Sequence, residues 1–273
     1  MLAKHFLDLP LKLRAYQTAK FVVVPVPYEA TTTYGQGTRR GPAAILTASL
    51  QVENFDEELK AEPYVFGIHT QGNCQIKGLA SRVKRHLAAG KTPIILGGEH
   101  SITPFVVKAA AQQDQALSVL QLDAHADLRD KYQGKKNNHA CVMRRVLEIC
   151  PAVQVGVRSL SKEEWGFAKK SGQDKKMHWA QDKLDIKKIK NQLSKNVYIT
   201  IDVDVFDPSL IPAVGTPEPG GLSWYQVLNL LREICQTKNV VGFDVVELSP
   251  RLNELVSPFA VAKLVYKVIS YLT

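Results

Sequence analysis

Two apolar runs of this sequence end in closely spaced acidic residues. The runs are 117–122 and 197–201, and each has the pattern of a buried β-strand. The residues that follow them are Asp123, His125 and Asp127 after the first run and Asp202 and Asp204 after the second. A spacing of two turns the side chains of an extended chain to one side, so these groups are predicted to converge. Crowded carboxylates repel one another and lose hydration, so that a cation or a hydrogen-bonded polar cluster must compensate them.

The remaining sequence alternates strand patterns with helical ones. Further strands are predicted at 21–26, 65–69, 93–96, 153–157 and 240–246. Helices are predicted to begin near Gly41, Ile76, Pro104, Ala140, Ser161, Leu184, Ser223 and Ser257. Because no linker-like segment interrupts this alternation, we predict a single domain over 1–273 with one mostly parallel sheet flanked by helices. Pro25 lacks an N–H group, so the end of the first strand is predicted to be an edge or a loop.

The composition is typical of a globular protein. Apolar residues make up 45% and charged residues 22% of the 273 positions, which argues against disordered and collagen-like chains. No apolar stretch approaches the roughly 20 residues of a membrane span. Residues 1–8 carry charge where a signal peptide needs an apolar core, so we expect a cytoplasmic protein that does not bind membranes. The four cysteines form no C-x-x-C pair, so buried, reduced thiols are expected.

The net charge of +9 raises the question of a nucleic-acid partner. Lysine pairs occur at 169–170, 175–176 and 187–188, in polar stretches without interleaved aromatic residues. No familiar nucleic-acid-binding motif accompanies them. These lysines are therefore predicted to be solvated surface groups, and no nucleic-acid partner is expected.

His100 and Glu247 stand at the ends of two other predicted strands. Ligands of open parallel sheets bind beyond the carboxyl ends of the strands, so one shared site is predicted. Its four aspartates would carry about four negative charges, which two divalent cations neutralise. Oxygen ligands with one imidazole per ion suit Mn²⁺, while Fe²⁺, Co²⁺ and catalytic Zn²⁺ stay open. A bridged pair of ions would supply hydroxide at neutral pH, so metal-assisted hydrolysis is the predicted reaction class.

Glu247 and His139 are candidates for contacts with a substrate. A carboxylate can hold a guanidinium group by a bidentate contact, but Glu247 could also form a salt bridge with a helix Lys or Arg. His139 lies in the loop after the acidic motif and could relay a proton to a leaving amine. The alternative for His139 is an exposed loop histidine. The polar, glycine-rich segment 28–41 is either part of the site or a plain connector.

Five ordered motifs resemble those of the ureohydrolase family, which contains arginases and agmatinases. They are Gly97-Gly-Glu-His-Ser101, Leu122-Asp-Ala-His-Ala-Asp127, Ile201-Asp-Val-Asp-Val205 with Asp207-Pro208, Gly215-Thr-Pro-Glu-Pro-Gly-Gly221 and Phe243-Asp-Val-Val-Glu247. The resemblance spans residues 28–250. It implies an arginase-like, three-layer αβα fold with a mostly parallel sheet. It also implies two Mn²⁺ ions per chain, at which a guanidinium group is hydrolysed to an amine and urea.

The resemblance implies roles for individual residues. All six metal ligands of the family are present, at His100, Asp123, His125, Asp127, Asp202 and Asp204. Glu247 matches the carboxylate that binds the guanidinium group, His139 matches the histidine that transfers a proton, and Asp127 is also expected to act in catalysis. Thr216 and Ser161 are expected to contact the substrate. The resemblance further suggests a homotrimer or homohexamer.

Residues beside the ligand motifs favour agmatine over arginine. Arginase-like members carry Asn two residues after the D-x-H-x-D motif and acidic residues after the G-x-R strand end, which hold the α-carboxylate and α-amino groups. In this sequence Arg129 and either Ser159 or Ser161 stand at those places. Ala140 follows His139, as in agmatinase-type members. We therefore predict hydrolysis of agmatine, a small cationic guanidino compound, to putrescine and urea.

Three alternatives stay open. Arg129 and Arg144 could pair with the carboxylate of a guanidino acid such as guanidinobutyrate, and arginine is a further candidate substrate. The metal site could instead serve the hydrolysis of another bond, such as an amide or a phosphoester. The third alternative is a family member without catalytic activity.

Overall fold

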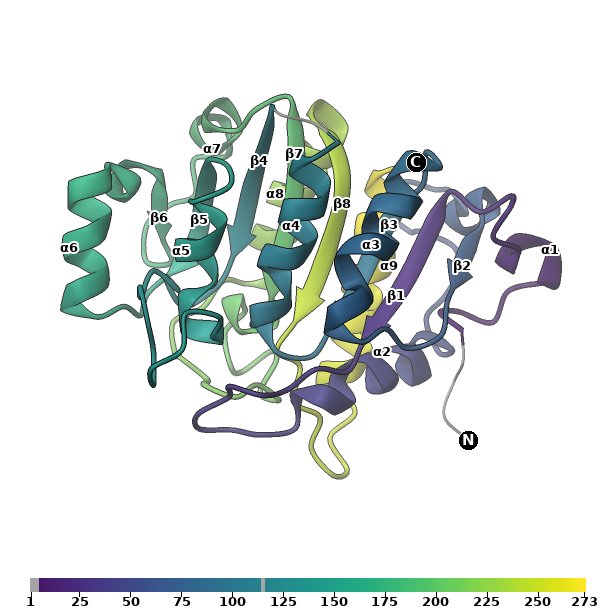
Figure 1. Ribbon diagram of the computed structural model, residues 1–273. Coiled ribbons are helices and arrows are strands. Elements are labelled where there is room, and N and C mark those ends of the chain that lie inside the picture. Colours follow the sequence, from purple (N-terminus) through teal and green to yellow (C-terminus); the bar gives the residue numbers. More distant parts are fainter. Residues whose placement is uncertain (1–4, 114–115) are drawn as a thin grey trace.

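An eight-stranded parallel sheet runs through the molecule (Figure 1). This computed structural model describes residues 5–113 and 116–273. The expectation about a signal peptide was based on residues 1–8, and residues 1–4 of that stretch lie outside the described residues. The strands are β1 (Phe21–Val26), β2 (Ile68–Thr70), β3 (Thr92–Gly97), β4 (Leu117–Leu122), β5 (Ala152–Val157), β6 (Met177–Trp179), β7 (Asn196–Asp202) and β8 (Asn239–Val246). Across the sheet their order is β2-β1-β3-β8-β7-β4-β5-β6.

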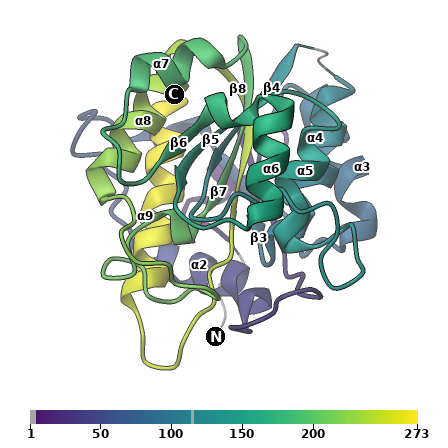
Figure 2. The same ribbon diagram turned by 90° about the vertical axis from the view of Figure 1, so that its left-hand side faces the viewer.

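Helices cover both faces of the sheet. They are α1 (Leu11–Arg14), α2 (Gly41–Ser49), α3 (Ile76–Ala88), α4 (Thr103–Ala111), α5 (Val142–Val146), α6 (Lys162–Ser171), α7 (Ile186–Gln192), α8 (Trp224–Thr237) and α9 (Val256–Tyr271). Figure 2 shows α2, α7, α8 and α9 on one side of the sheet and α3 to α6 on the other. Each side has its own apolar core, built from the helices of that side and one face of the sheet. The expected three-layer αβα fold is confirmed.

Four strands that are far apart in sequence are neighbours in the middle of the sheet. The strands β7 and β8 lie between β3 and β4, and each pairs with its neighbour in parallel register. Burial on both faces explains their almost continuous apolar sequences. Because all strands run in one direction, the carboxyl ends of β3, β8, β7 and β4 meet at the centre of one edge of the sheet.

Most predicted elements are confirmed, with boundaries shifted by a few residues. The strand predicted at 65–69 is wrong in its first half, because Pro63–Phe66 forms a 3₁₀ turn and Gly67 takes a left-handed φ of 76° before β2 begins. The helix predicted near Ala140 begins as a 3₁₀ turn that continues into α5. The elements α1 and β6 were not predicted because four and three residues are too few to show a periodic pattern.

Pro25 lies where its missing N–H group is not needed. The strand β1 is an inner strand between β2 and β3, but β2 pairs with it only through Phe21–Val23. Beyond that point, the backbone N–H of Cys74 donates to the carbonyl of Pro25 at 2.8 Å. The last part of β1 is therefore an edge on that side, as the proline predicted.

All four cysteines are buried, and no disulfide forms among residues 5–113 and 116–273. This agrees with the expectation of reduced thiols. Of the helices in the described part of the chain, none combines the length and the apolar character that a membrane crossing requires.

A buried ion cluster ties α9 to the segment after α2. Lys267 is 1% exposed, and its Nζ lies 3.0 Å from Asp56 Oδ1 and 2.8 Å from Glu58 Oε2. Lys267→Met is expected to lower the free energy of unfolding by about 3–5 kcal/mol, because it leaves the fully buried Asp56 carboxylate without its cation. Lys263→Met, one turn earlier on α9, removes a more exposed pair with Glu57 and should cost less than about 1 kcal/mol. Urea denaturation measures both variants, and equal losses would contradict this account.

His86 on α3 is expected to make stability depend on pH. Its Nδ1 lies 3.0 Å from the Tyr16 hydroxyl and its Nε2 lies 3.2 Å from Gln71 Oε1. Burial, assisted by Arg85, lowers the pKa of His86 from 6.5 to about 4. The unfolded chain therefore binds more protons between these two values, so stability is complete above pH 6.5 and falls as the pH drops towards 4. We expect a loss on the order of 2 kcal/mol after allowance for solvent screening.

Urea denaturation of the parent protein and of His86→Gln, above pH 6.5 and near pH 4, tests this expectation. The glutamine variant should lose less stability on acidification than the parent protein. The same loss in both proteins would assign the acid sensitivity to other groups.

Candidate metal centre and active site

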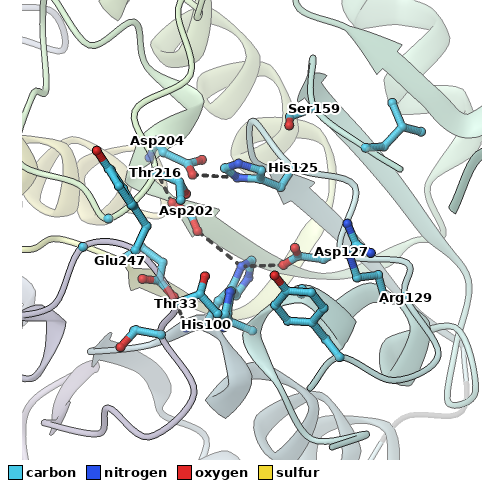
Figure 3. A pocket seen from close by; sticks show the side chains of 18 of the residues that line it. Thr33, His100, His125, Asp127, Arg129, Ser159, Asp202, Asp204, Thr216 and Glu247 are labelled. Atoms are coloured by element: carbon cyan, nitrogen blue, oxygen red, sulfur yellow. Dashed lines mark hydrogen bonds and ion pairs between the residues drawn. The ribbon is translucent and has the colours of Figure 1, made fainter. Parts of the chain in front are cut away.

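The predicted ligands gather at the carboxyl ends of the four central strands. His100 follows β3, the acidic motif of 123–127 follows β4, β7 ends in Asp202, and Glu247 follows β8. Figure 3 shows a cavity lined by the side chains of His100, His125, Asp127, Asp202, Asp204 and Glu247. The turn between β3 and His100 needs glycine, because a Cβ at Gly98 would overlap the carbonyl oxygen of Tyr28. The structure thus brings all six predicted ligands into one place.

His100 is the centre of a first group of ligands. Its Nδ1 lies 3.2 Å from Asp123 Oδ2. The same nitrogen lies 3.4 Å from both Asp127 Oδ2 and Asp202 Oδ2 (Figure 3). This nitrogen is buried and forms no hydrogen bond with any residue that the structure describes. A buried nitrogen that faces three carboxylates without a hydrogen bond is the arrangement expected where a cation would sit between them.

A buried hydrogen-bond chain orients the imidazole of His100. Its Nε2 lies 2.9 Å from the hydroxyl oxygen of Thr200, which donates to Asp244 Oδ1 at 2.5 Å. Tyr198 and Thr103 donate to the other oxygen of Asp244. Since the single hydroxyl proton of Thr200 goes to the carboxylate, Thr200 accepts from Nε2–H. Nδ1 is therefore the nitrogen of His100 that can offer a lone pair to a metal.

His125 is the centre of a second group. Its Nδ1 lies 2.9 Å from Asp204 Oδ2 and 3.6 Å from Asp123 Oδ1. Asp123 belongs to both groups, with Oδ2 towards His100 and Oδ1 towards His125. The potential ligand atoms of His100, Asp123 and Asp127 lie within 4.8 Å of one another, and so do those of Asp123, His125 and Asp204. Two sets of ligands that share one carboxylate are suited to a pair of adjacent ions.

Negative charge exceeds positive charge in this cluster. Burial and a neighbouring carboxylate raise the pKa of Asp127 to about 7, and burial together with Asp204 raises the pKa of Asp202 well above its ordinary value. Burial raises the pKa of Glu247 to about 8. Burial acts to lower the pKa of His125, but the Asp204 carboxylate outweighs it and raises this pKa to about 12. The cluster retains protons because it is short of cations.

The residues present fit a pair of divalent cations. Two positive ions would offset the excess of carboxylates and would occupy the space in front of the free nitrogen of His100. Carboxylate oxygens with imidazole nitrogens suit hard to borderline divalent ions of the first transition row. The geometry supports a binuclear site and leaves the identity of the ions open.

Asp127 and Glu247 adopt an unusual backbone conformation. Their φ angles are 53° and 65°, in the left-handed region that residues other than glycine rarely occupy. The Asp127 carbonyl accepts from the N–H groups of Met143 and Arg144, and the N–H of Glu247 donates to the carbonyl of Gly98. Such backbone strain costs about 1–3 kcal/mol and persists where the surroundings hold it, often at functional positions. Both carboxylates line the cavity.

A cavity of about 260 Å³ opens over the ligand cluster. Apart from ligands, its lining residues include Thr32, Thr33, Tyr34, Gly35, Arg129, Tyr132, His139, Ser159, Ser161, Glu164, Thr216 and Glu247. All residues predicted to contact a substrate are in this set. The segment 28–41, which could have been a plain connector, contributes four consecutive lining residues.

Glu247 and His139 face the cavity rather than a partner on the surface. Glu247 Oε1 accepts from the backbone N–H of His100 at 2.7 Å, and no ion pair to Glu247 exists within the described part of the chain. The alternative of a salt bridge to a helix Lys or Arg therefore finds no support. His139 is partly buried, and its backbone N–H and its Nδ1 both contact the hydroxyl oxygen of Thr31.

Ser161 and Arg129 form one wall of the cavity with Glu164. The Ser161 hydroxyl accepts from the N–H of Glu164 and the Ser161 N–H donates to Glu164 Oε2, which is the predicted capping box of α6. Arg129 Nε lies 3.7 Å from Glu164 Oε2, and its guanidinium carbon lies 4.9 Å from the ring centre of Tyr132. Arg129 therefore already has an anionic and an aromatic partner within the protein.

Sequence reasoning missed the polar residues that support the ligands from inside the strands. Thr200 and Asp244 orient His100, and Gln121 donates to Asp123 Oδ2 at 2.7 Å. Each is a polar residue inside an otherwise apolar strand. Because buried polar groups need partners, such isolated polar positions next to a ligand motif are a usable signal.

Known proteins resemble this chain in sequence and structure. The model of the arginase family matches residues 19–270. The N(1)-aminopropylagmatine ureohydrolase of Synechocystis is 40% identical, over 98% of this chain and 94% of its own. The agmatinase of Pyrococcus horikoshii is 37% identical, over 96% of this chain and 95% of its own. The crystal structure of the agmatine ureohydrolase of Thermoplasma volcanium matches with a TM-score of 0.87 at 32% identity, over 100% of this chain and 95% of that chain.

Proposed function

Because this chain belongs to the arginase family of ureohydrolases, we propose that it hydrolyses agmatine to putrescine and urea with two Mn²⁺ ions per chain. Glu247 carries the proposal. Its carboxylate lines the cavity beside the metal-ligand cluster and forms no ion pair with any described residue. A guanidinium group would supply the missing cation, and its two parallel N–H groups match the two oxygens of a carboxylate.

The overall reaction breaks one C–N bond and forms one C–O bond. Water adds its oxygen to the guanidinium carbon, urea keeps that oxygen, and the departing amine takes both protons of the water. The divalent ions, when bound, offset the carboxylate charge and activate water at neutral pH. Asp127 is expected to hold the attacking water by a hydrogen bond. Burial lowers the pKa of His139, which leaves a neutral imidazole that can accept a proton and pass it to the amine nitrogen.

The surroundings of two arginines support a substrate without a carboxylate. Arg129 is occupied by Glu164 and Tyr132, as described above. The guanidinium carbon of Arg144 lies 3.5 Å from the ring centre of Phe167, and Arg144 does not line the cavity. The charge of Arg129 is thus partly compensated by Glu164, and Arg144 lies outside the cavity lining. This favours agmatine over arginine and guanidinobutyrate.

N(1)-aminopropylagmatine is a second candidate substrate. The Synechocystis relative at 40% identity is named for this compound, and the P. horikoshii relative at 37% is named for agmatine. Both compounds present the same guanidinium group and butyl chain to Glu247 and differ only beyond the far amine. The interior of the site therefore suits either compound.

Urea release from four compounds tests the proposal. Mn²⁺-loaded protein is expected to act on agmatine or N(1)-aminopropylagmatine with a kcat/KM at least about 10²-fold above that for arginine and guanidinobutyrate, because neither acid finds a cation for its carboxylate. A preference for either acid would reject the agmatine-class substrate. Absence of urea from all four compounds would reject the ureohydrolase activity.

Several properties expected from the sequence stay predictions. They are manganese as the bound metal, a cytoplasmic location, a homotrimeric or homohexameric assembly, and the lack of a nucleic-acid partner. Metal analysis of the protein purified without added metal identifies the ions, and light scattering after gel filtration measures the oligomeric state.

A further inference from the structure

A buried carboxylate outside the ligand set anchors the segment before the cavity-lining residues 32–35. Glu99 is fully buried. Its Oε2 accepts from the backbone N–H groups of Ala30 and Thr31, each at 2.6 Å. Its Oε1 accepts from the hydroxyl of Ser101 at 2.6 Å and from the hydroxyl of Thr31. An ionised carboxylate offers about four acceptor positions, and here all four are filled.

The direction of these bonds determines the role of the Thr31 hydroxyl. A hydroxyl has one proton, and that of Thr31 goes to Glu99. The oxygen of Thr31 can therefore only accept in its other hydrogen bonds. Two groups of His139 lie within reach of it, the backbone N–H at 3.1 Å and the ring Nδ1 at 3.3 Å.

The ring nitrogen of His139 must then be the donor in its contact with Thr31. This requires a proton on Nδ1, which in a neutral imidazole leaves the lone pair on Nε2. The two bonds from one residue to one oxygen also restrict rotation of the ring. His139 lines the cavity, so Nε2 is the nitrogen left to exchange protons there.

We infer that Thr31, oriented by Glu99, is a positioning residue that fixes His139 as the tautomer with Nδ1 protonated and Nε2 free. The catalytic consequence rests on the proposed function, in which His139 passes a proton to the departing amine. The assignment of the tautomer is independent of the proposed function. The same device of histidine, threonine and carboxylate orients His100 through Thr200, there with the free nitrogen at Nδ1.

Nitrogen NMR of the imidazole groups tests the tautomer directly. The protein is labelled with ¹⁵N-histidine and loaded with Mg²⁺, which is diamagnetic, and His139→Gln identifies the signals of this residue. Sedimented protein in the solid state makes the measurement independent of the size of the assembly. We expect a protonated Nδ1 and a bare Nε2 in the parent protein. A protonated Nε2 would overturn the inference.

Thr31→Val and Thr31→Ser separate the hydroxyl from the rest of the side chain. In Thr31→Val the His139 signals should move towards the other tautomer, and kcat for agmatine should fall by roughly 10–100-fold with little change in KM. Thr31→Ser keeps the hydroxyl and should restore both the signals and kcat. Thr47→Val on α2, whose hydroxyl donates to the Ala43 carbonyl at 2.9 Å, is the matched control and should behave as the parent.

The outcomes separate this inference from the proposed function. If no guanidino compound releases urea but Thr31→Val still changes the His139 signals, the tautomer assignment stands and the proposed function fails. If urea is released and Thr31→Val leaves the His139 signals unchanged, the role of Thr31 is wrong. Thermal unfolding of each variant confirms that the fold is intact before either comparison.

Discussion

Glu247→Gln is expected to lower kcat/KM for agmatine by about 10²–10³-fold. Loss of one partner of a desolvated charge pair costs about 2–5 kcal/mol, and each 1.4 kcal/mol is a factor of ten. Glutamine keeps the size of the side chain and can still accept the 2.7 Å hydrogen bond from the N–H of His100. The fold and the metal content should therefore be preserved. Steady-state urea release, with metal content measured on the same samples, gives the result.

Glu148→Gln is a matched control for this variant. Glu148 pairs with Arg145 on the surface, and its substitution should leave urea release unchanged. Full activity of Glu247→Gln on agmatine would show that this carboxylate does not bind the guanidinium group. An enzyme that hydrolyses an amide or a phosphoester would lose little in this variant, because such a substrate need not carry a cation.

Asp202→Asn is expected to weaken binding of Mn²⁺ by at least about 10²-fold and to remove most of the activity. The metal-free variant should nevertheless be at least as stable as the metal-free parent protein. Burial and the carboxylate of Asp204 raise the pKa of Asp202, so its charge is unfavourable in the absence of a cation. Asparagine can still accept the 2.9 Å hydrogen bond from the N–H of Asp204. Thermal unfolding with and without Mn²⁺, together with metal analysis, measures both effects.

Asp182→Asn, at an exposed position, should change neither metal content nor stability. If Asp202→Asn destabilises the metal-free protein strongly, the carboxylate has a structural role instead. A parent protein that holds far fewer than two ions per chain after reconstitution would favour the alternative of a family member without catalytic activity.

The local sequence was sufficient to predict most of the residues that gather in the candidate metal centre. The apolar runs of β4 and β7 end at the carboxyl edge of the sheet, so the positions of Asp123 and Asp202 follow from the strand patterns alone. The predicted alternation does not extend to Asp127, whose φ is 53°, or to Asp204, which lies in the 3₁₀ turn Val203–Val205. The capping box at Ser161 is local too, since its partners are three residues apart. The strand predicted at 65–69 was wrong in its first half because Gly67 takes a positive φ, which the apolar residues around it do not reveal.

The support around the ligands could not be found from local patterns. His139 and Thr31 are 108 residues apart in sequence, and Glu99 and Thr31, which are hydrogen-bonded, are 68 residues apart. These pairs form only because the loops after β1, β3 and β4 reach the same end of the sheet. The left-handed backbone at Asp127 and Glu247 is likewise imposed by neighbouring segments, since neither residue favours it on its own.

The sequence by itself determined which residues end the strands and what metal chemistry they can offer, because an apolar strand pattern and the acidic residues that follow it are properties of one local segment. Only the tertiary structure decided that β7 and β8 lie between β3 and β4, which places His100, Asp127, Asp202 and Glu247 around one cavity. Strand order depends on packing between distant segments and leaves no periodic trace in any one of them. The same packing left Glu247 without a cationic partner among the described residues, as the proposed contact with a guanidinium group requires.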